Sequence, residues 1–210
     1  MSFFVHNNTG DSMIIRLGYV SICKTLNDSI SFHNLTYSNY SKNNENRLDI
    51  TIKENCKTLT NILKFNKKNN IHFYRMTSNL LPLLTHKQVN KKIEDYKVYL
   101  NNVSKYILDD MRIDIHSDQF NVLNSTKKEV IDNTVNNLIH RYKTLKYLNI
   151  KNPIIILHVG SSEFGKLKSI TRFINNFKLL PKYLQNSIVL ENDDKIFNIK
   201  DVLFICKELN

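Results

Sequence analysis

The sequence has few of the residues that mark several common classes of protein. Its three cysteines, Cys23, Cys56 and Cys206, are odd in number and widely spaced, and no CxxC pair occurs. This pattern argues against a disulfide framework and a cysteine-based zinc site, and it favours the reducing cytoplasm. No apolar run approaches the length of about 18 residues that a membrane span needs. The first twelve residues also lack the cationic start and apolar stretch of a secretory signal.

Positive charge is the main excess. Lys and Arg number 30 against 19 Asp and Glu, which gives a net charge of +11 and a pI near 9.5. Such an excess favours an anionic partner such as nucleic acid, although a solvated basic surface is the alternative. The abundance of Asn and Lys without any Trp also fits the bias of an AT-rich coding sequence, which raises the number of lysines without a functional cause. At 41% hydrophobic residues and 210 residues in all, we expect a single globular domain with a real core.

Apolar runs of strand length alternate with longer segments of helical periodicity. A polar stretch rich in Asn and Ser, residues 27–47, predicts a long loop, and Pro181 predicts a short turn. The predicted strands are residues 14–20, 71–75, 111–116, 153–159 and 187–191, and the predicted helices are residues 53–69, 90–108, 127–148, 167–177 and 200–209.

Five consecutive strand–helix units predict parallel strands joined by right-handed crossovers. Two α/β architectures fit this order, an open doubly wound sheet and part of a TIM barrel. The chain has only four glycines, one of which, Gly18, lies inside the first predicted strand, and no GxGxxG or P-loop motif follows that strand. This argues against a nucleotide-binding open sheet and favours the barrel.

Three predicted strands end in side chains that bind metal ions. His116 ends the third strand, His158 lies near the end of the fourth, and Glu191 ends the fifth. In a TIM barrel the carboxyl ends of the strands form the active face, so these side chains can converge on one centre. Imidazole and carboxylate suit manganese, zinc or iron. His86, in the loop after the second strand, could reach the same face. The alternative for any one of these histidines is a plain hydrogen-bonding role, which is the more common one for a single histidine at a strand end.

A polar and an aromatic residue follow one candidate ligand. Gln119 can hydrogen-bond base edges, and the ring of Phe120 can stack in a gap in a duplex. From composition alone, an ordinary loop with Phe120 packed inward is the simpler alternative. Tyr19, at the end of the first predicted strand, is equally ambiguous.

Five blocks of the sequence, in order and at family-like spacing, resemble the UV damage endonuclease family. Any one block is weakly specific, and the five together carry the resemblance from about Met13 to the last residue. The blocks are RLGYVSI (16–22), HFYRMTSNLLPLLTH (72–86), RIDIHSDQFNVLN (112–124), ILHVGS (156–161) and IVLENDDK (188–195).

The resemblance implies a TIM barrel that binds a cluster of divalent ions, typically Mn²⁺. It also implies hydrolysis of double-stranded DNA immediately 5′ of a UV lesion, leaving a 3′-hydroxyl and a 5′-phosphate. In this chain it implies metal ligands at His86, His116, His158 and Glu191, with Glu191 as the bridging catalytic carboxylate, and residues that probe the lesion at Tyr19, Gln119 and Phe120.

The chain departs from the family pattern in three respects. Phe120 stands where a Tyr is often found, and Cys23 stands where some members have an Asn. The resemblance reaches only the first five of the barrel's eight units, so we expect a truncated barrel over residues 13–210 after an N-terminal extension, residues 1–12. We therefore expect the chain alone to be inactive or very weak, and a second chain is a possible source of the remaining strands.

Other functions stay open on the sequence alone. Abasic-site endonucleases and sugar isomerases of similar architecture also place His and Glu at strand ends. A DNA-binding remnant that has lost catalysis would keep the basic surface.

Overall fold

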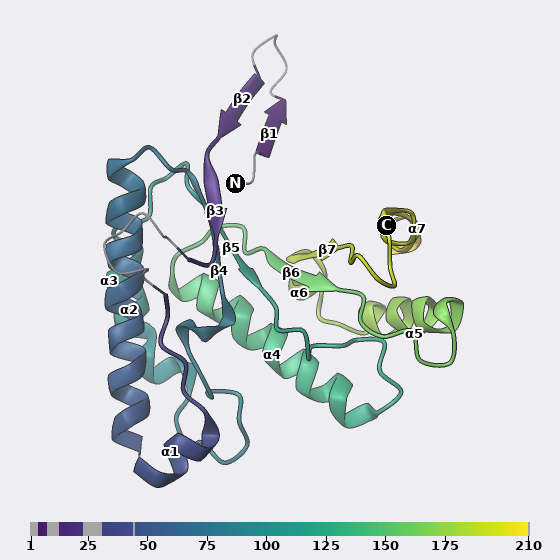
Figure 1. Ribbon diagram of the computed structural model, residues 1–210, viewed down its shortest axis with the longest axis horizontal. Coiled ribbons are helices and arrows are strands. Elements are labelled where there is room, and N and C mark those ends of the chain that lie inside the picture. Colours follow the sequence, from purple (N-terminus) through teal and green to yellow (C-terminus); the bar gives the residue numbers. More distant parts are fainter. Residues whose placement is uncertain (1–3, 8–12, 23–30, 44, 210) are drawn as a thin grey trace. The chain divides into compact units, whose positions relative to one another are not determined.

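The computed structural model describes residues 4–7, 13–22, 31–43 and 45–209, which form two compact units (Figure 1). Unit 1 is residues 1–114 with 146–150, and unit 2 is residues 115–145 with 151–210. Unit 1 contains β1 (Phe4–Asn7), β2 (Met13–Arg16), β3 (Gly18–Val20), α1 (Tyr37–Asn43), α2 (Glu45–Lys68), β4 (Phe73–Met76), the 3₁₀ helices η1 (Ser78–Leu80) and η2 (Ile93–Tyr96), and α3 (Lys97–Ser104). β5 (Arg112–His116) begins in unit 1 and ends in unit 2, which holds most of α4 (Lys128–Tyr147) and all of β6 (Ile155–His158), α5 (Lys166–Lys178), α6 (Lys182–Gln185), β7 (Ile188–Glu191) and α7 (Ile199–Leu209).

Five strands form one sheet in the order β3-β4-β5-β6-β7. The pairs β3–β4, β5–β6 and β6–β7 are parallel. Parallel neighbours need a crossover, and helical segments lie between the successive strands of this sheet. The predicted α/β class with parallel strands is therefore confirmed.

The first predicted strand, residues 14–20, is two strands in the structure. β2 pairs antiparallel with β1, with Asn7 opposite Met13, whereas β3 pairs parallel with β4. The break lies between the segment that pairs with β1 and the segment that pairs with β4. Gly18 is required at the new pairing, because a Cβ there would lie 2.3 Å from the side chain of Phe73. The predicted extension, residues 1–12, contains β1, and its boundary remains a prediction.

The prediction of a long loop over residues 27–47 is wrong from Tyr37 onward. α1 covers Tyr37–Asn43, and α2 begins at Glu45, eight residues before the predicted helix. Buried Leu48 and Ile52 continue the apolar stripe of α2 one turn at a time. The many Asn and Ser residues concealed this periodicity. Residues 23–30, which include Cys23, lie outside the described residues.

Helices α2 and α3 lie side by side in unit 1 (Figure 1). The structure has a shorter helical segment than the predicted residues 90–108, because it begins with η2 at Ile93 and ends with α3 at Ser104. At its start the Asp95 carboxylate accepts a hydrogen bond from the Lys92 N–H at 2.9 Å. Of the apolar positions that predict this helix, Ile93, Tyr96, Leu100 and Val103 are buried, whereas Ile107 lies beyond the end of α3 and is half-buried.

The core of unit 2 lies on either side of β6. Ile155, Ile156 and Leu157 are at most 1% exposed, as expected for a strand of a parallel sheet that is buried on both faces. The predicted helices of this unit agree with α4, α5 and α7 to within one or two residues at each end, and the turn predicted at Pro181 leads into the short helix α6. Among the described residues, no helix combines the length and apolarity needed to cross a membrane.

Candidate metal centre and nucleic-acid interface

Three neighbouring strands end in the predicted ligands. β5 ends at His116, β6 at His158 and β7 at Glu191. His158 is directly opposite Glu191, and His116 is opposite Ile156, two residues before His158. Because side chains alternate along a strand, this register places all three ligand side chains on one face of the sheet, at its carboxyl end.

The three side chains are close enough to share one ion. One ligand atom from each of His116, His158 and Glu191 lies within 4.8 Å of the other two, and all three residues are half-buried. The two imidazole rings are 5.1 Å apart between centroids and are inclined at 54°. Two nitrogen donors and one carboxylate fit a first-row divalent ion.

Backbone carbonyls orient both imidazoles. His116 Nδ1 lies 2.7 Å from the Ser117 carbonyl oxygen, and His158 Nδ1 lies 3.2 Å from the Glu191 carbonyl oxygen. A carbonyl oxygen only accepts, so each Nδ1 donates and Nε2 keeps its lone pair for a metal ion. This is the usual arrangement around metal-binding histidines, in which the second nitrogen fixes the tautomer and the ring orientation.

Asp193 is a second carboxylate near this group that the sequence alone did not single out. Burial acts to raise the pKa of Asp193, but backbone N–H donors and the nearby His158 together hold it below its ordinary value. The N–H of Lys195 donates at 2.8 Å and that of Phe197 at 3.1 Å, and Ile196 supplies the third donor. Asp193 thus stays ionised and organises the turn after β7.

His86, the fourth predicted ligand, belongs to unit 1. It follows η1, and its ring stacks on Tyr37 of α1 at 4.2 Å between centroids and 15° between planes. Its Nδ1 lies 3.3 Å from the Gln88 N–H. A metal-binding role for His86 remains a prediction.

Gln119 and Phe120 stand out into solvent in the loop after β5. Phe120 is 77% exposed, so the simpler alternative of a ring packed inward is wrong. Gln119 is exposed as well. A single exposed ring is common on protein surfaces and does not by itself indicate a partner, so the role as a lesion probe remains a prediction.

An ion pair and hydrogen bonds hold the residues on either side of this pair against α4. The Asp118 carboxylate pairs with Arg141 at 2.8 Å, and the Arg141 side chain is only 8% exposed. On the other side, Asn137 Nδ2 donates to the Asn121 side-chain oxygen at 2.8 Å, and Asn121 Nδ2 donates to the Ser117 hydroxyl at 2.7 Å. The exposed pair is therefore presented on a firmly held loop.

Tyr19, the remaining predicted probe, lies in unit 1. Its hydroxyl donates to Asn66 Oδ1 on α2 at 2.8 Å, and its ring lies 5.1 Å from that of Tyr74. These contacts hold the half-buried side chain against its neighbours, and its role at a lesion remains a prediction.

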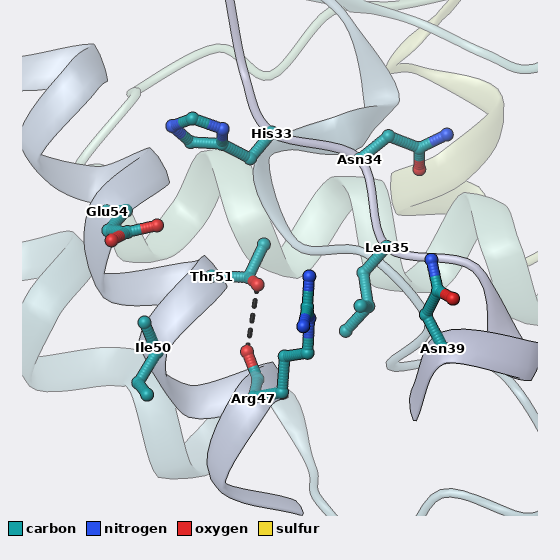
Figure 2. A pocket seen from close by; sticks show the side chains of 8 residues that line it. All are labelled: His33, Asn34, Leu35, Asn39, Arg47, Ile50, Thr51 and Glu54. Atoms are coloured by element: carbon teal, nitrogen blue, oxygen red, sulfur yellow. Dashed lines mark hydrogen bonds between the residues drawn. The ribbon is translucent and has the colours of Figure 1, made fainter. Parts of the chain in front are cut away.

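Unit 1 also contains a cavity of about 290 Å³ beside the start of α2 (Figure 2). Arg47 extends between Thr51 and Leu35 in this view, and the Thr51 hydroxyl donates to the Arg47 carbonyl oxygen at 2.8 Å. His33 and Glu54 also line the cavity. None of the predicted site residues lines it.

Comparison with known proteins gives consistent matches. The family model described as UV-endonuclease UvdE matches residues 15–210. The chain is 31% identical over 205 residues to the UV DNA damage endonuclease of Bacillus cereus (strain B4264), covering 94% of the chain and 65% of that protein. It is also 31% identical over 203 residues to that of Bacillus thuringiensis subsp. konkukian (strain 97-27), covering 93% and 64%.

The solved structure titled "Crystal Structure of SacUVDE" superimposes with a TM-score of 0.83 at 34% identity, covering 92% of this chain and 66% of that one. This likeness and the parallel strand–helix order support the predicted TIM-barrel class. The chain spans about 65% of the length of the curated relatives it matches.

Proposed function

Because the chain belongs to the UV-endonuclease UvdE family, as its sequence blocks predict, we propose that it acts in a metal-dependent endonuclease that cuts DNA 5′ of UV photoproducts. The observation that supports this most strongly is the convergence of His116, His158 and Glu191 at the ends of three adjacent strands. A cytoplasmic location is part of the same proposal.

The residues fit a divalent ion, which we take to be Mn²⁺. His116 and His158 would bind through Nε2, with Nδ1 held by a backbone carbonyl, and Glu191 would bind through its carboxylate. When bound, such an ion supplies Lewis-acid chemistry for phosphodiester hydrolysis. The catalytic and bridging role given to Glu191, and ligation by His86, belong to this proposal.

On the DNA side, Gln119 and Phe120 would enter the duplex at the lesion, and Tyr19 would approach from the opposite side. The exposure of Phe120 and the contacts that hold the neighbouring residues Asp118 and Asn121 against α4 support this role. Damaged pairs are easier to unstack, so a rigid wedge would select many lesions without reading the base sequence.

Further strand–helix units have a suitable surface in unit 2. β7 is at the end of the described sheet, and its Val189 is 44% exposed. Ile199, Leu203 and Phe204 of α7 are 55%, 54% and 49% exposed. We propose that additional barrel strands pack on this surface, from the same polypeptide or from a second chain, as the greater length of the relatives suggests.

The test is a nicking assay on a labelled duplex that carries one cyclobutane pyrimidine dimer, with Mn²⁺ present. The chain is assayed alone and mixed with the part of the Bacillus cereus relative that the match leaves uncovered. Glu191→Gln removes the proposed catalytic carboxylate, and Glu54→Gln, at an exposed position of α2, is the matched control.

We expect a cut immediately 5′ of the dimer that requires Mn²⁺ and falls at least about a hundredfold in Glu191→Gln but not in Glu54→Gln. A cut only in the mixture would support packing of further units on β7 and α7. Cutting at abasic sites but never at dimers would contradict the proposed substrate. Salt-sensitive DNA binding without cutting in the mixture would favour a non-catalytic remnant.

A further inference from the structure

A second exposed aromatic residue lies in the loop after β6. Phe164 is 70% exposed, close to the 77% of Phe120 in the loop after β5. The Gly165 N–H donates to the Ser162 carbonyl oxygen at 2.9 Å and closes a tight turn with Phe164 at its third position. Phe164 therefore extends into water from a defined turn.

The backbone of Phe164 is strained. Its φ is +60°, a left-handed conformation that turns usually assign to Gly or Asn at this position. A bulky side chain is rare there, and such outliers persist where the surroundings impose them, often at functional sites. Nothing about the local turn requires an aromatic ring, so the side chain itself calls for an explanation.

Hydrogen bonds to α5 and to the loop after β5 hold the turn in place. The Glu163 carbonyl oxygen accepts from the Arg172 guanidinium at 2.6 Å and from the Ser169 hydroxyl at 3.0 Å, both on α5. Fully buried Asn124 donates to the Ser161 carbonyl oxygen at 2.7 Å and accepts from the Ser161 N–H at 3.1 Å. The turn is thus fixed to α5 and to the loop after β5.

The same contacts join the two loops that carry the exposed rings. The Thr126 hydroxyl donates to the Glu163 carboxylate at 2.8 Å, and Thr126 belongs to the loop that presents Phe120. Both loops leave strands that end in a candidate metal ligand, His116 or His158. Exposed Lys168 follows the turn closely in sequence, exposed Lys127 directly follows Thr126 in the other loop, and both complement a polyanion.

We propose that Phe164 is a second aromatic contact to DNA, a fixed face on which a base stacks when the duplex opens at a lesion. This inference rests on the proposed function and adds a residue to its DNA interface. Every base has a π-face, so such a contact would be independent of base sequence. It would act together with Phe120, because the two loops are hydrogen-bonded to each other.

The experiment measures binding by fluorescence anisotropy, with a labelled duplex carrying one pyrimidine dimer and with EDTA present to prevent cutting. Phe164→Gly removes the ring and suits the positive φ. Phe120→Ala reports on the proposed lesion probe. Leu179→Ala is the matched control, because Leu179 is 81% exposed at the opposite end of α5.

We expect Phe164→Gly to weaken binding to the damaged duplex about tenfold, the loss typical of one stacked base, and to affect undamaged duplex less. Leu179→Ala should bind as the wild type does. Unchanged binding in Phe164→Gly alongside weakened binding in Phe120→Ala would overturn the role of Phe164 and leave the proposed function standing. A wild-type chain that binds neither duplex, alone or mixed with the uncovered part of the Bacillus cereus relative, would overturn both.

Thermal unfolding separates this role from a structural one. Because glycine relieves the strained φ and the ring makes little buried contact, Phe164→Gly should leave the unfolding midpoint unchanged or raise it. A clear fall would identify Phe164 as part of the fold and would contradict the proposal. Phe164→Leu keeps an apolar side chain without a π-face, so binding that survives this change would also contradict stacking.

Discussion

At the scale of single residues, burial and backbone contacts decide what each side chain can do. His116 and His158 each use Nδ1 on a carbonyl oxygen, which leaves Nε2 for another partner. Cys56 shows the opposite case. It lies 5% exposed in α2, and burial raises the pKa of its thiol to about 12. Hydrogen bonding thus leaves the two imidazoles able to bind another partner, whereas burial keeps the Cys56 thiol protonated near neutral pH.

Alkylation tests the inert thiol. In the native chain at pH 8, we expect iodoacetamide to modify half-buried Cys206 well before Cys56, because the thiolate is the nucleophile. Peptide mass spectrometry measures the two rates, and urea-unfolded chain is the control in which they converge. Native rates that are equal would contradict the burial of Cys56.

The same shift has a consequence for stability. The folded-state pKa of Cys56 is above its ordinary 9.0, so the unfolded state loses the thiol proton first as pH rises. The contribution of Cys56 to the free energy of unfolding is therefore full below pH 9 and is lost progressively between pH 9 and about 12. Cys56→Ala should show a shallower decline in stability over that window.

At the scale of elements, single polar side chains join segments that are far apart in sequence. Asn55, fully buried in α2, accepts from the His33 N–H at 2.7 Å and donates to the His33 carbonyl oxygen at 3.0 Å. It also donates to the Asn79 carbonyl oxygen at 2.9 Å. One amide therefore positions both the segment before α1 and the 3₁₀ helix after β4.

Removing this amide should be costly. Asn55→Ala leaves several buried backbone groups without partners, so we expect a loss of about 2–4 kcal/mol in the free energy of unfolding. Lys57→Ala, on the exposed side of the same helix, should change it by less than about 0.5 kcal/mol. Urea denaturation followed by circular dichroism measures both. Equal stabilities would show that water replaces these bonds.

At the scale of the whole molecule, the net charge of +11 is the property that bears on the proposed DNA partner. Phosphate contacts release counterions, so affinity for DNA should fall with added salt. The proposed contacts of the two exposed rings, Phe120 and Phe164, differ from phosphate contacts, because stacking on a base releases no condensed cations. Charge and stacking therefore make separable contributions to binding.

We expect the affinity for duplex DNA to fall at least about tenfold between 50 and 200 mM salt, the loss calculated for two phosphate contacts. Phe164→Gly should lower affinity at every salt concentration and leave the slope unchanged, whereas Lys168→Gln should reduce the slope. Anisotropy titrations at four salt concentrations measure both. An affinity that does not depend on salt would place the positive charge away from the DNA.

The sequence by itself determined the strand–helix order and the candidate ligands, because hydrophobic periodicity is local and three strands visibly end at or near His116, His158 and Glu191. It failed over residues 37–47, where polar composition concealed the start of α2. The tertiary structure alone decided that the three ligands share one face, because strand register is set between distant segments. It alone revealed the turn that exposes Phe164, since hydrogen bonds from Asn124 and Arg172 hold that turn from elsewhere in the fold.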